Sequence, residues 1–371
     1  MIIWWKKPAK QLTIAMAWWW SWGHVFPIKS LLERIDKKPQ YTERVDKIYR
    51  FGSEKWLEQQ ICNELQLPEI DLKFVPIFSG KFRRETPRKS RLKNIRDIFL
   101  FVGWFFQSLF YLLRYGIDVI FCKGGYVALP VVLAGALLHK KVIVHESDTK
   151  PWLVNKIAHR FATKTFTWFD NVFPNAKTVG QILSDDILSW IADPKQLPLR
   201  TSILVVGGSQ GSRRLYQTFL HVLQDTPDLQ HIFDFHMVLW LLNQEMSTEF
   251  DKFPNVHLYG FASQKKMGEL YNLCDIAITR GGTTALAEQK LYDIRQLIIP
   301  IPRTHDQYDN ALRYVHHYKD IMLDQRDISF QVKLTKALLK LRNFKKKESK
   351  KDKQAVISKA KEIIIKSILG L

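Results

Sequence analysis

Ala-Met-Ala-Trp-Trp-Trp-Ser-Trp-Gly-His-Val-Phe-Pro, residues 15–27, separates a strand-like apolar run at 12–17 from a helix-like segment at 28–35. A strand, a short turn and a helix in this order begin a βαβ unit of a parallel sheet. Glycine is expected at such a turn when a ligand binds there, because it tolerates positive φ and lets the backbone approach the ligand. Four of the five residues at 18–22 are tryptophan instead.

The alternation of strand and helix continues along the chain. Apolar runs of strand length are separated by segments of helix length, which is typical of parallel sheets with right-handed crossovers. We expect strands at residues 12–17, 47–51, 73–77, 118–122, 141–145 and 164–169, and then at 202–206, 235–239, 256–259, 276–279 and 296–301. The sequence therefore predicts an α/β fold with two Rossmann-like domains facing a cleft.

A linker between the two domains is expected at residues 180–199, where Pro194, Pro198 and a loss of apolar periodicity interrupt the pattern. Isoleucines at helical spacing close to the C-terminus predict a last helix. We therefore expect a first domain at 1–180, a second domain at 181–350 and a C-terminal helix at 351–371.

The composition is that of a globular protein with a high basic charge. The chain has 371 residues, 46% hydrophobic and 25% charged, which excludes a disordered protein. A net charge of +20 is compatible with a nucleic-acid partner, an anionic membrane surface or a merely lysine-rich composition. Cys62, Cys122 and Cys274 have neither metal nor disulfide spacing, and no secretory signal is evident, so we expect a reducing, cytoplasmic environment.

A basic cluster precedes a long apolar run of helix length. Eight lysines and arginines lie between residues 81 and 96, and the apolar run at 98–113 follows at once. This run of 16 residues is shorter than the ~20 that a membrane-spanning helix needs. Either one face of the helix enters a membrane interface beside anionic lipid, or the helix is wholly buried and the basic residues are merely solvated.

Three loops that follow strands of the second half carry ligand-binding residue types. Gly-Gly-Ser-Gln-Gly-Ser at 207–212 offers backbone N–H groups at the start of a helix, where a diphosphate binds well. In Arg-Gly-Gly-Thr-Thr-Ala-Leu-Ala-Glu at 280–288, Glu288 lies one turn into a helix and can accept hydrogen bonds from a ribose diol. The third loop is at 303–311. Because ligands bind at the carboxyl ends of parallel strands, the second half is predicted to bind a nucleotide.

With glycine at positions 18, 19, 20 and 22, the opening stretch closely resembles the N-terminal signature of the MurG family, in glycosyltransferase family 28. Gly-Gly-Tyr-Val at 124–127, the segment at 145–148 and the three loops of the second half resemble further motifs of this family, in the family's order. The resemblance extends from Thr13 to about Asn310. It implies the two-domain GT-B architecture, with the C-terminal helix returning to the first domain.

The resemblance also implies a reaction: inverting transfer of GlcNAc from UDP-GlcNAc to the C4 hydroxyl of undecaprenyl-diphospho-MurNAc-pentapeptide. Such an enzyme would lie peripherally on the cytoplasmic face of an anionic membrane. We expect neither a metal ion nor another cofactor, and no nucleic-acid partner.

Site residues follow from the matched motifs. Phe261 would pack on the uracil, Ala262 would offer its backbone to the uracil edge, and the third loop would bind the sugar hydroxyls. The expected donor-binding residues are Gly208, Ser209, Gln210, Gly211, Phe261, Ala262, Thr283, Glu288, Gln307 and Asn310. The expected acceptor-binding residues are Ser21, Gly23, His24, Tyr126 and Asp148. His24 and Glu146 are alternative general bases.

Three positions depart from the family pattern. Asp306 stands where the family has the first of two glutamines, and Asp148 stands where it has asparagine. The segment ending at Ser184 lacks an arginine that is expected to face phosphate. These departures concern recognition of the sugar and of the acceptor diphosphate.

Tryptophan replaces glycine at other matched positions as well, including Trp56, Trp152 and Trp240. The chain has 17 glycines, about 4.6% against a usual ~7%, and counting its 12 tryptophans as glycine gives about 7.8%. We therefore hypothesise that UGA codons in the gene encode glycine and appear as tryptophan in the translated sequence. Mass spectrometry of native protein that found indole at residues 18–20 would refute this hypothesis.

Three other functions remain open. The same fold could transfer a sugar to diacylglycerol, and a labelled-donor assay with both acceptors would discriminate. The basic charge could serve nucleic-acid binding, which predicts steep salt dependence without affinity for UDP. If the tryptophans are genuine, their bulk would fill the acceptor loop and leave an inactive binding protein.

Overall fold

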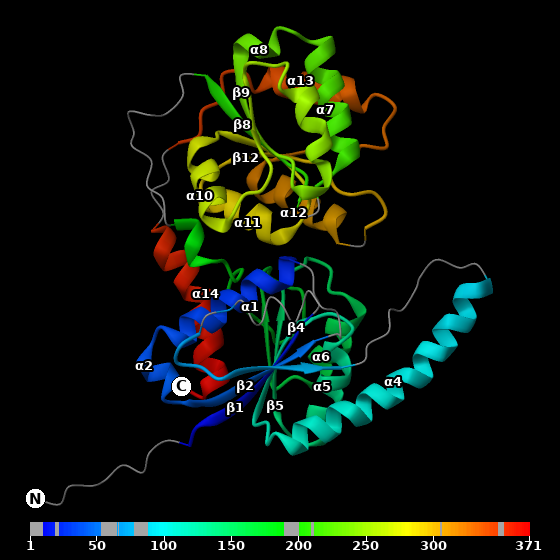
Figure 1. The fold of residues 1–371 in the computed structure, drawn as a ribbon, viewed down its shortest axis with the longest axis vertical. Helices are drawn as coiled ribbons and strands as arrows, with labels where there is room; N and C mark the ends of the chain where they lie inside the picture. Colours follow the sequence, from blue (N-terminus) through cyan, green and yellow to red (C-terminus); the bar gives the residue numbers. More distant parts are fainter. Residues whose placement is uncertain are drawn as a thin grey trace, which may run out of the picture. The chain divides into compact units, whose positions relative to one another are not determined.

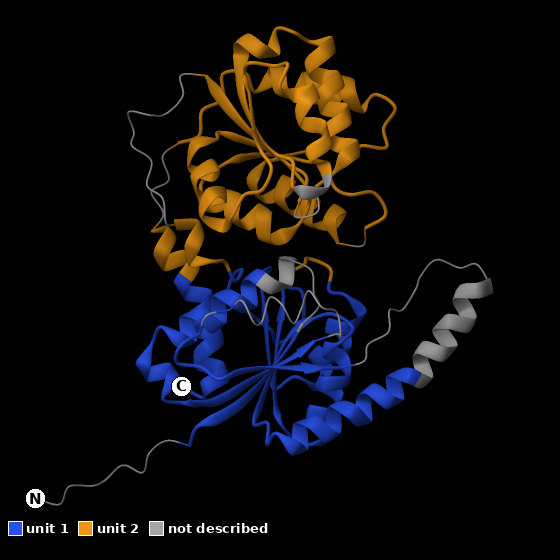
Figure 2. Cartoon of the chain, in the orientation of Figure 1, with its two compact units in different colours: residues 1–147, 151–182, 358–371 blue, residues 148–150, 183–357 orange. Residues whose placement is uncertain are grey.

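The computed structural model describes residues 10–18, 22–52, 65, 67–77, 88–188, 200–208, 211–304, 306–347 and 352–371. The chain forms two compact units, coloured blue and orange in Figure 2. Unit 1 comprises residues 1–147, 151–182 and 358–371, and unit 2 comprises residues 148–150 and 183–357. The main division therefore lies two residues beyond the predicted end of the first domain.

Unit 1 is built on a seven-stranded parallel sheet in the order β3-β2-β1-β4-β5-β6-β7 (Figure 1). Its strands are β1 (Leu12–Trp18), β2 (Val45–Gly52), β3 (Leu72–Pro76), β4 (Val119–Gly124), β5 (Lys141–Glu146), β6 (Lys164–Thr167) and β7 (Lys177–Thr178). Its helices are α1 (Trp22–Asp36), α2 (Pro39–Thr42), α4 (Arg88–Arg114), α5 (Ala128–Leu137), α6 (Leu153–Phe161) and most of α14 (Lys353–Leu369). The strand order reverses between β1 and β4, as it does in a Rossmann fold.

The apolar run of β1 is continuous because helices cover both faces of the sheet. Successive side chains point to opposite faces. Ile14 and Met16 belong to a core cluster with α1 and α14, whereas Ala15 and Ala17 belong to a second cluster with α4 and α5. The pattern that resembled a strand in the sequence is therefore a central strand buried on both sides.

Unit 2 is built on a six-stranded parallel sheet in the order β10-β9-β8-β11-β12-β13. Its strands are β8 (Thr201–Val206), β9 (Phe233–Val238), β10 (Val256–Tyr259), β11 (Ile276–Thr279), β12 (Arg295–Ile298) and β13 (Ile321–Met322). Its α-helices are α7 (Arg213–Asp225), α8 (Leu229–Ile232), α9 (Ser247–Phe250), α10 (Gln264–Leu273), α11 (Thr283–Leu291), α12 (Gln307–Tyr318) and α13 (Phe330–Lys340), and the 3₁₀ turns are η1 (Asp185–Leu188) and η3 (Leu241–Met246). Here the order reverses between β8 and β11.

Helix α14 completes the core of unit 1. Ile364, Ile365 and Ile368 are fully buried in the cluster that contains β1 and α1. Glu362 accepts hydrogen bonds from Arg34 at 3.0 Å and from Lys38 at 2.6 Å, and also from the hydroxyl of Tyr41. Burial opposes ionisation of Glu362, but these hydrogen bonds outweigh it and hold its pKa at about 2. A clamp of charge-assisted bonds therefore fixes the last helix to α1 and α2.

The structure adds two strands that the sequence did not predict. Both β7 and β13 contain two residues and lie at the edge of their sheets. A two-residue strand has no apolar run or alternation to detect. Every strand that the sequence predicted overlaps a strand of the structure, with ends that shift by up to three residues.

Candidate functional site

The two turns next to the reversal of strand order are the natural ligand sites of these sheets. In unit 1, Trp18 at the end of β1 pairs with Gly124 at the end of β4, so the loops that follow both strands begin side by side. In unit 2, Val205 of β8 pairs with Ile278 of β11, which brings together the turns at 207–212 and 280–283. The glycine motifs of the sequence therefore lie where the topology places a ligand.

The turn after β8 requires glycine at several positions. Gly208 has φ +85° and Gly211 has φ +70°, and the Gly211 N–H donates to the Gly208 carbonyl at 2.8 Å. A Cβ on Gly207 would lie 2.6 Å from the Ser212 nitrogen. Because backbone atoms surround that position, a side chain cannot be accommodated without moving the turn. The turn leads directly into α7, a helix of 13 residues whose N-terminus favours an anion.

Arg280, which follows β11, lies beneath this turn. Its side chain is 5% exposed and donates to the Ile299 carbonyl at 2.8 Å, to Gln325 Oε1 at 2.9 Å, and to the Ser212 hydroxyl. Burial lowers its pKa to about 10, so the guanidinium remains charged at neutral pH. No role was expected for Arg280 from the sequence, although a cation directly after a predicted strand was a detectable signal.

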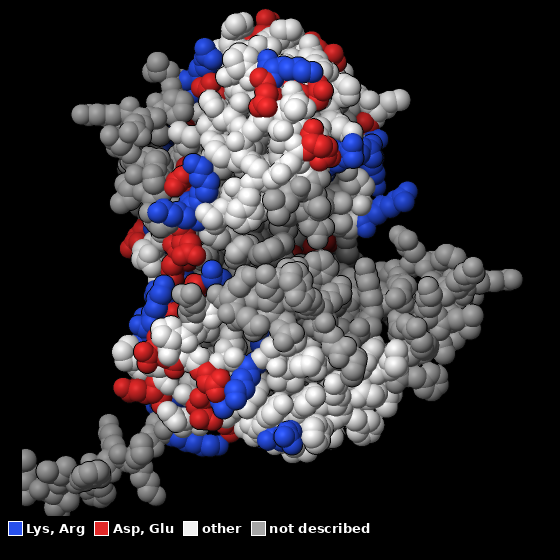
Figure 3. Space-filling model, viewed as in Figure 1, with Lys and Arg blue, Asp and Glu red and all other residues white. Residues whose placement is uncertain are grey.

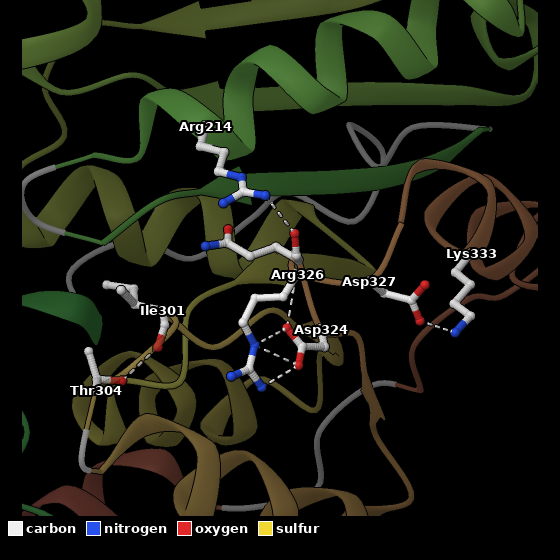
Figure 4. A network of polar contacts seen from close by, with 8 residues as sticks. Arg214, Ile301, Thr304, Asp324, Arg326, Asp327 and Lys333 are labelled. Carbon is white, nitrogen blue, oxygen red and sulfur yellow. Dashed lines mark hydrogen bonds and ion pairs between the residues drawn. The ribbon is translucent and has the colours of Figure 1, made fainter. Parts of the chain in front are cut away.

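The loop after β13 holds Arg280 from the other side. The Arg214 guanidinium donates to the backbone carbonyl of Gln325 at 3.1 Å, and the Gln325 side chain is buried against Arg280. In the same loop Arg326 forms an ion pair with Asp324 at 2.6 Å (Figure 4). Asp327 also pairs with Lys333 of α13, so both ends of the loop are anchored. The role of this loop could not be predicted from the sequence.

The third loop supplies two amide side chains. Gln307 Oε1 accepts from the N–H groups of Gly281 at 3.2 Å and Ile301 at 3.0 Å. Asn310 is fully buried, and its Nδ2 donates to Asp148 Oδ1 at 3.0 Å. Thr283 also donates to Asp148, at 3.4 Å. The structure thus brings Asp148, predicted as an acceptor contact, together with the predicted donor contacts Thr283 and Asn310.

Glu288 lies on α11 and is 4% exposed. The Tyr271 hydroxyl donates to its Oε2 at 2.9 Å. Burial raises the pKa of Glu288 to about 7 despite this hydrogen bond. The carboxyl group therefore titrates near physiological pH.

The aromatic part of the site lies at the end of β10. Phe261 is 58% exposed, which leaves its ring accessible, and the Ala262 side chain is buried. The ring of Trp240 meets Phe261 edge to face at 5.5 Å between centroids. Trp240 has φ 60° and ψ 163°, a conformation that is essentially restricted to glycine.

Trp168 and Trp104 also bear on the glycine hypothesis. The Nε1 atoms of Trp168 and Trp240 are buried without a hydrogen-bond partner among the described residues, although a buried indole N–H usually has one. In contrast, Trp104 is 8% exposed and packs in the core of unit 1. The backbone at residue 240 therefore supports glycine, while residue 104 holds an indole without conflict.

The carboxyl edge of unit 1 carries a buried polar network. Glu146 is 3% exposed, and its two oxygens accept from the Ser147 N–H at 2.7 Å and from Asn155 Nδ2 at 2.8 Å. Lys123, which is 2% exposed, donates to the Ser147 hydroxyl, and that hydroxyl donates to Gln181 at 2.8 Å. The geometry gives Glu146 a positioning role within the loop after β5.

Glycines shape the loop after β4. Gly124 has φ +103° and Gly125 has φ +92°, and a Cβ on Gly124 would lie 3.1 Å from the Asn155 amide. Tyr126 follows and meets Trp152 edge to face at 5.0 Å. The loop therefore positions Tyr126 at the switch point of unit 1.

Several predicted residues fall outside this description. Ser21, Ser209 and Gln210 lie outside the described residues. Gly23 and His24 lie in the first turn of α1, and only their backbone is described. In the described part of the chain, no group of three or more His, Cys, Asp or Glu side chains could hold a metal ion.

Comparison with known protein families matches two separate regions of the chain. The glycosyltransferase family 28 N-terminal domain model matches residues 14–167, and the family 28 C-terminal domain model matches residues 202–367. The first model therefore covers strands of the unit 1 sheet, and the second covers the unit 2 sheet together with the part of α14 that belongs to unit 1.

Curated relatives match over most of their length. The UDP-N-acetylglucosamine--N-acetylmuramyl-(pentapeptide) pyrophosphoryl-undecaprenol N-acetylglucosamine transferase of Staphylococcus aureus strain MRSA252 is 29% identical over 325 residues, which cover 84% of this chain and 86% of the relative. The protein of the same name from strain JH9 is 30% identical over 296 residues, which cover 76% of this chain and 79% of the relative.

Solved structures confirm the predicted fold. MurG of Acinetobacter baumannii superimposes with a TM-score of 0.71 at 18% identity, covering 97% of this chain and 100% of that one. UDP-GlcNAc 2-epimerase of Neisseria meningitidis has a TM-score of 0.62 at 11% identity, with 97% and 100% covered. With both domain models and a curated relative at 30% identity matched, the chain belongs to glycosyltransferase family 28 and, within it, to the MurG family.

Proposed function

We propose that this protein transfers GlcNAc from UDP-GlcNAc to the C4 hydroxyl of undecaprenyl-diphospho-MurNAc-pentapeptide, with inversion at the anomeric carbon. The names of its curated relatives support both substrates. The observation that carries the proposal is the glycine turn of unit 2, with the buried Arg280 beneath it and Glu288 on the adjacent helix. A uridine diphosphate needs these three features: N–H donors, a fixed positive charge and a ribose acceptor.

Unit 2 binds the donor in this proposal. The uracil packs on the exposed ring of Phe261 beside the Ala262 backbone, and the ribose hydroxyls donate to Glu288. The diphosphate is bound by Gly208, Ser209, Gln210 and Gly211 and by the start of α7. Thr283, Gln307 and Asn310 border the sugar, and Asp148 is hydrogen-bonded to two of them.

The reaction is a single displacement. The acceptor O4 forms a bond to C1 of GlcNAc as the bond from C1 to the phosphate oxygen breaks, and the electron pair leaves with UDP. N–H groups of the glycine turn and the charge of Arg280 stabilise the developing negative charge, because these dipoles are already oriented. A base takes the C4 hydroxyl proton. We assign this role to His24 in preference to Glu146, because both oxygens of Glu146 already accept hydrogen bonds within its loop.

Unit 1 binds the acceptor in this proposal. The stretch from the end of β1 to the first turn of α1, with Ser21, Gly23 and His24, would bind its diphosphate, and Tyr126 would contact its sugar, as would Asp148 of the 148–150 segment. This role requires backbone N–H groups at the turn, which glycine would leave accessible and tryptophan would cover. Acceptor binding is therefore the step most dependent on the identity of residues 18–22.

Helix α4 supports peripheral attachment to an anionic membrane. Its inner face includes Trp104 and Leu112 in the core, but Val102, Phe106, Phe110 and Leu113 remain 51–60% exposed. These four residues recur at helical spacing and form one apolar stripe. The helix begins within the basic cluster. An exposed apolar stripe next to basic residues favours the interfacial interpretation over a wholly buried helix.

No described helix is long and apolar enough to cross a bilayer. On the face drawn in Figure 3, basic and acidic side chains are intermixed over unit 2. From the lipid-linked acceptor named for the relatives and the exposed stripe of α4, we propose a protein on the cytoplasmic face of the membrane, and we expect no nucleic-acid partner.

A paired assay tests the proposal. We would measure UDP release from UDP-GlcNAc with a soluble-tailed lipid-linked MurNAc-pentapeptide, for the chain as written and for a variant with all twelve tryptophans changed to glycine. Activity only in the glycine variant would support both the enzyme and the glycine hypothesis. Activity in the chain as written would show that the indoles are compatible with catalysis. Transfer only to diacylglycerol, or no transfer by either chain, would overturn the proposal.

A further inference from the structure

A basic groove lies in unit 1, away from the glycine turns. It has a volume of about 1040 Å³ and is lined by α6, by the first residues of β6 and β7, and by the end of α14. Lys164 and Lys177 begin their strands, so they lie at the amino edge of the sheet. The candidate site uses the carboxyl edge, and in a parallel sheet the two edges are opposite. The groove is therefore separate from the proposed catalytic machinery.

The lining carries a strong positive charge. Five cationic side chains line the groove: Lys156, Arg160, Lys164, Lys177 and Lys366. No aspartate or glutamate is among the lining residues, and none of the five cations forms an ion pair with a described residue. The last residue, Leu371, also lines the groove, and its carboxylate likewise has no ion pair with a described residue. Five cations against one carboxylate leave a positive potential, which concentrates anions from solution.

A buried hydroxyl in the lining lacks a partner. Ser367 of α14 is 7% exposed, and its Oγ has no hydrogen-bond partner among the described residues. Buried polar atoms without partners are rare because leaving them unbonded costs free energy. Nearby, the Lys141 ammonium donates to the Ser367 carbonyl, and burial together with Lys164 lowers the pKa of Lys141. The groove thus combines an unused hydrogen-bonding group with a positive local potential.

We infer that the basic groove binds a phosphoryl anion, with the lysine and arginine side chains as charge partners and the Ser367 hydroxyl as a hydrogen-bond donor. A multivalent anion fits five cations around one groove better than a single carboxylate would. The phosphoryl group could belong to a lipid headgroup or to a free phosphate. This inference is independent of the glycosyltransferase proposal, because no lining residue belongs to the candidate site.

The test compares two double variants of the full chain. Lys164→Gln with Lys177→Gln removes two charges from the groove. Lys336→Gln with Lys340→Gln removes two charges from exposed positions of α13 in unit 2 and is the matched control. All four lysines are exposed, so we expect both variants to fold. Calorimetry with inorganic pyrophosphate, with saturating UDP present, measures the free anion; cosedimentation with phosphatidylglycerol vesicles measures the headgroup.

We expect the groove variant to weaken binding at least tenfold in one arm and the control variant to change it less than twofold. The arm that responds identifies the source of the phosphoryl group. A Ser367→Ala variant should weaken the same binding about threefold without a change in melting temperature. Equal losses in the groove and control variants, or no binding of either probe, would overturn the inference. GlcNAc transfer to a soluble-tailed acceptor should be unchanged in the groove variant, so the two proposals fail separately.

Discussion

The turn after β1 and the turn after β8 occupy equivalent places in their sheets and have opposite compositions. Both follow a central strand with a buried interior and precede a helix next to the reversal of strand order. The second turn has glycines at 207, 208 and 211, whereas the stretch from the end of β1 to the start of α1 has tryptophans at 18, 19, 20 and 22. The strand order is the same type in both sheets despite this difference, because buried strands and crossover helices determine the strand order. The approach of a ligand to the backbone does depend on these residues, because glycine has no side chain to block it.

The largest expected effect comes from a side chain in the second turn. Gly207→Ala would place a Cβ 2.6 Å from the Ser212 nitrogen and 2.9 Å from the Gly211 carbonyl carbon. Because backbone atoms cannot rotate away, we expect loss of detectable UDP binding and a lower melting temperature. Gly103→Ala in α4 has open space around the new Cβ and serves as control. Full UDP affinity in the Gly207→Ala variant would show that the turn does not bind the diphosphate.

The charge beneath the second turn comes next. Arg280→Met keeps the length of the side chain and removes its charge, which we expect to raise the Kd for UDP roughly 100-fold, since breaking a buried charge pair costs about 2–5 kcal/mol. Arg280→Lys should lose less UDP affinity than Arg280→Met, because lysine keeps the positive charge although it cannot form the same three hydrogen bonds. Titration calorimetry with UDP and with uridine separates the two contributions. Equal weakening of both ligands would contradict a phosphate-directed role.

Glu288 offers a pH-dependent comparison within unit 2. Burial raises its pKa to about 7, whereas an unfolded chain has ~4.3, so the native state retains a proton that the unfolded state loses between these values. Stability should therefore fall by on the order of 3 kcal/mol as the pH rises from about 4.5 to 7. Glu288→Gln keeps an oxygen that accepts the hydrogen bond from Tyr271, and it should remove this fall in stability with rising pH. Urea unfolding at several pH values measures it, and identical slopes in both proteins would refute the assignment.

The smallest effect tests the glycine hypothesis at one residue. Trp240 has a backbone conformation that costs a non-glycine residue about 1–3 kcal/mol. Trp240→Gly should relieve that strain, whereas Trp240→Ala loses the same indole contacts and keeps the strain. We therefore expect the glycine variant to be about 1 kcal/mol more stable than the alanine variant in urea unfolding. A more stable alanine variant would show that residue 240 has no need for glycine.

The central strands and both glycine motifs could be predicted because their signals are local. Ile14 to Ala17 form an apolar run, and Gly208 and Gly211 follow another. Arg280 and Gln325 are 45 residues apart and meet only in the folded unit, so no local pattern reveals their contact. The interactions of Asp148 with Thr283 and Asn310 are equally remote in sequence. Predictions at Ser21, Ser209 and Gln210 remain predictions, because these residues lie outside the described part of the chain.

Helix α14 has a consequence for the order of events during synthesis. Unit 1 needs Ile364, Ile365 and Ile368 to fill its core, although the rest of that unit ends at Ile182. At the usual 5–20 residues per second, a ribosome takes roughly 10 to 40 s to add the intervening residues. Unit 2 can acquire its full sheet during that interval, whereas the first half of the chain waits with an apolar face uncovered. The part synthesised first is therefore expected to be the part that matures last and the one that depends most on a chaperone.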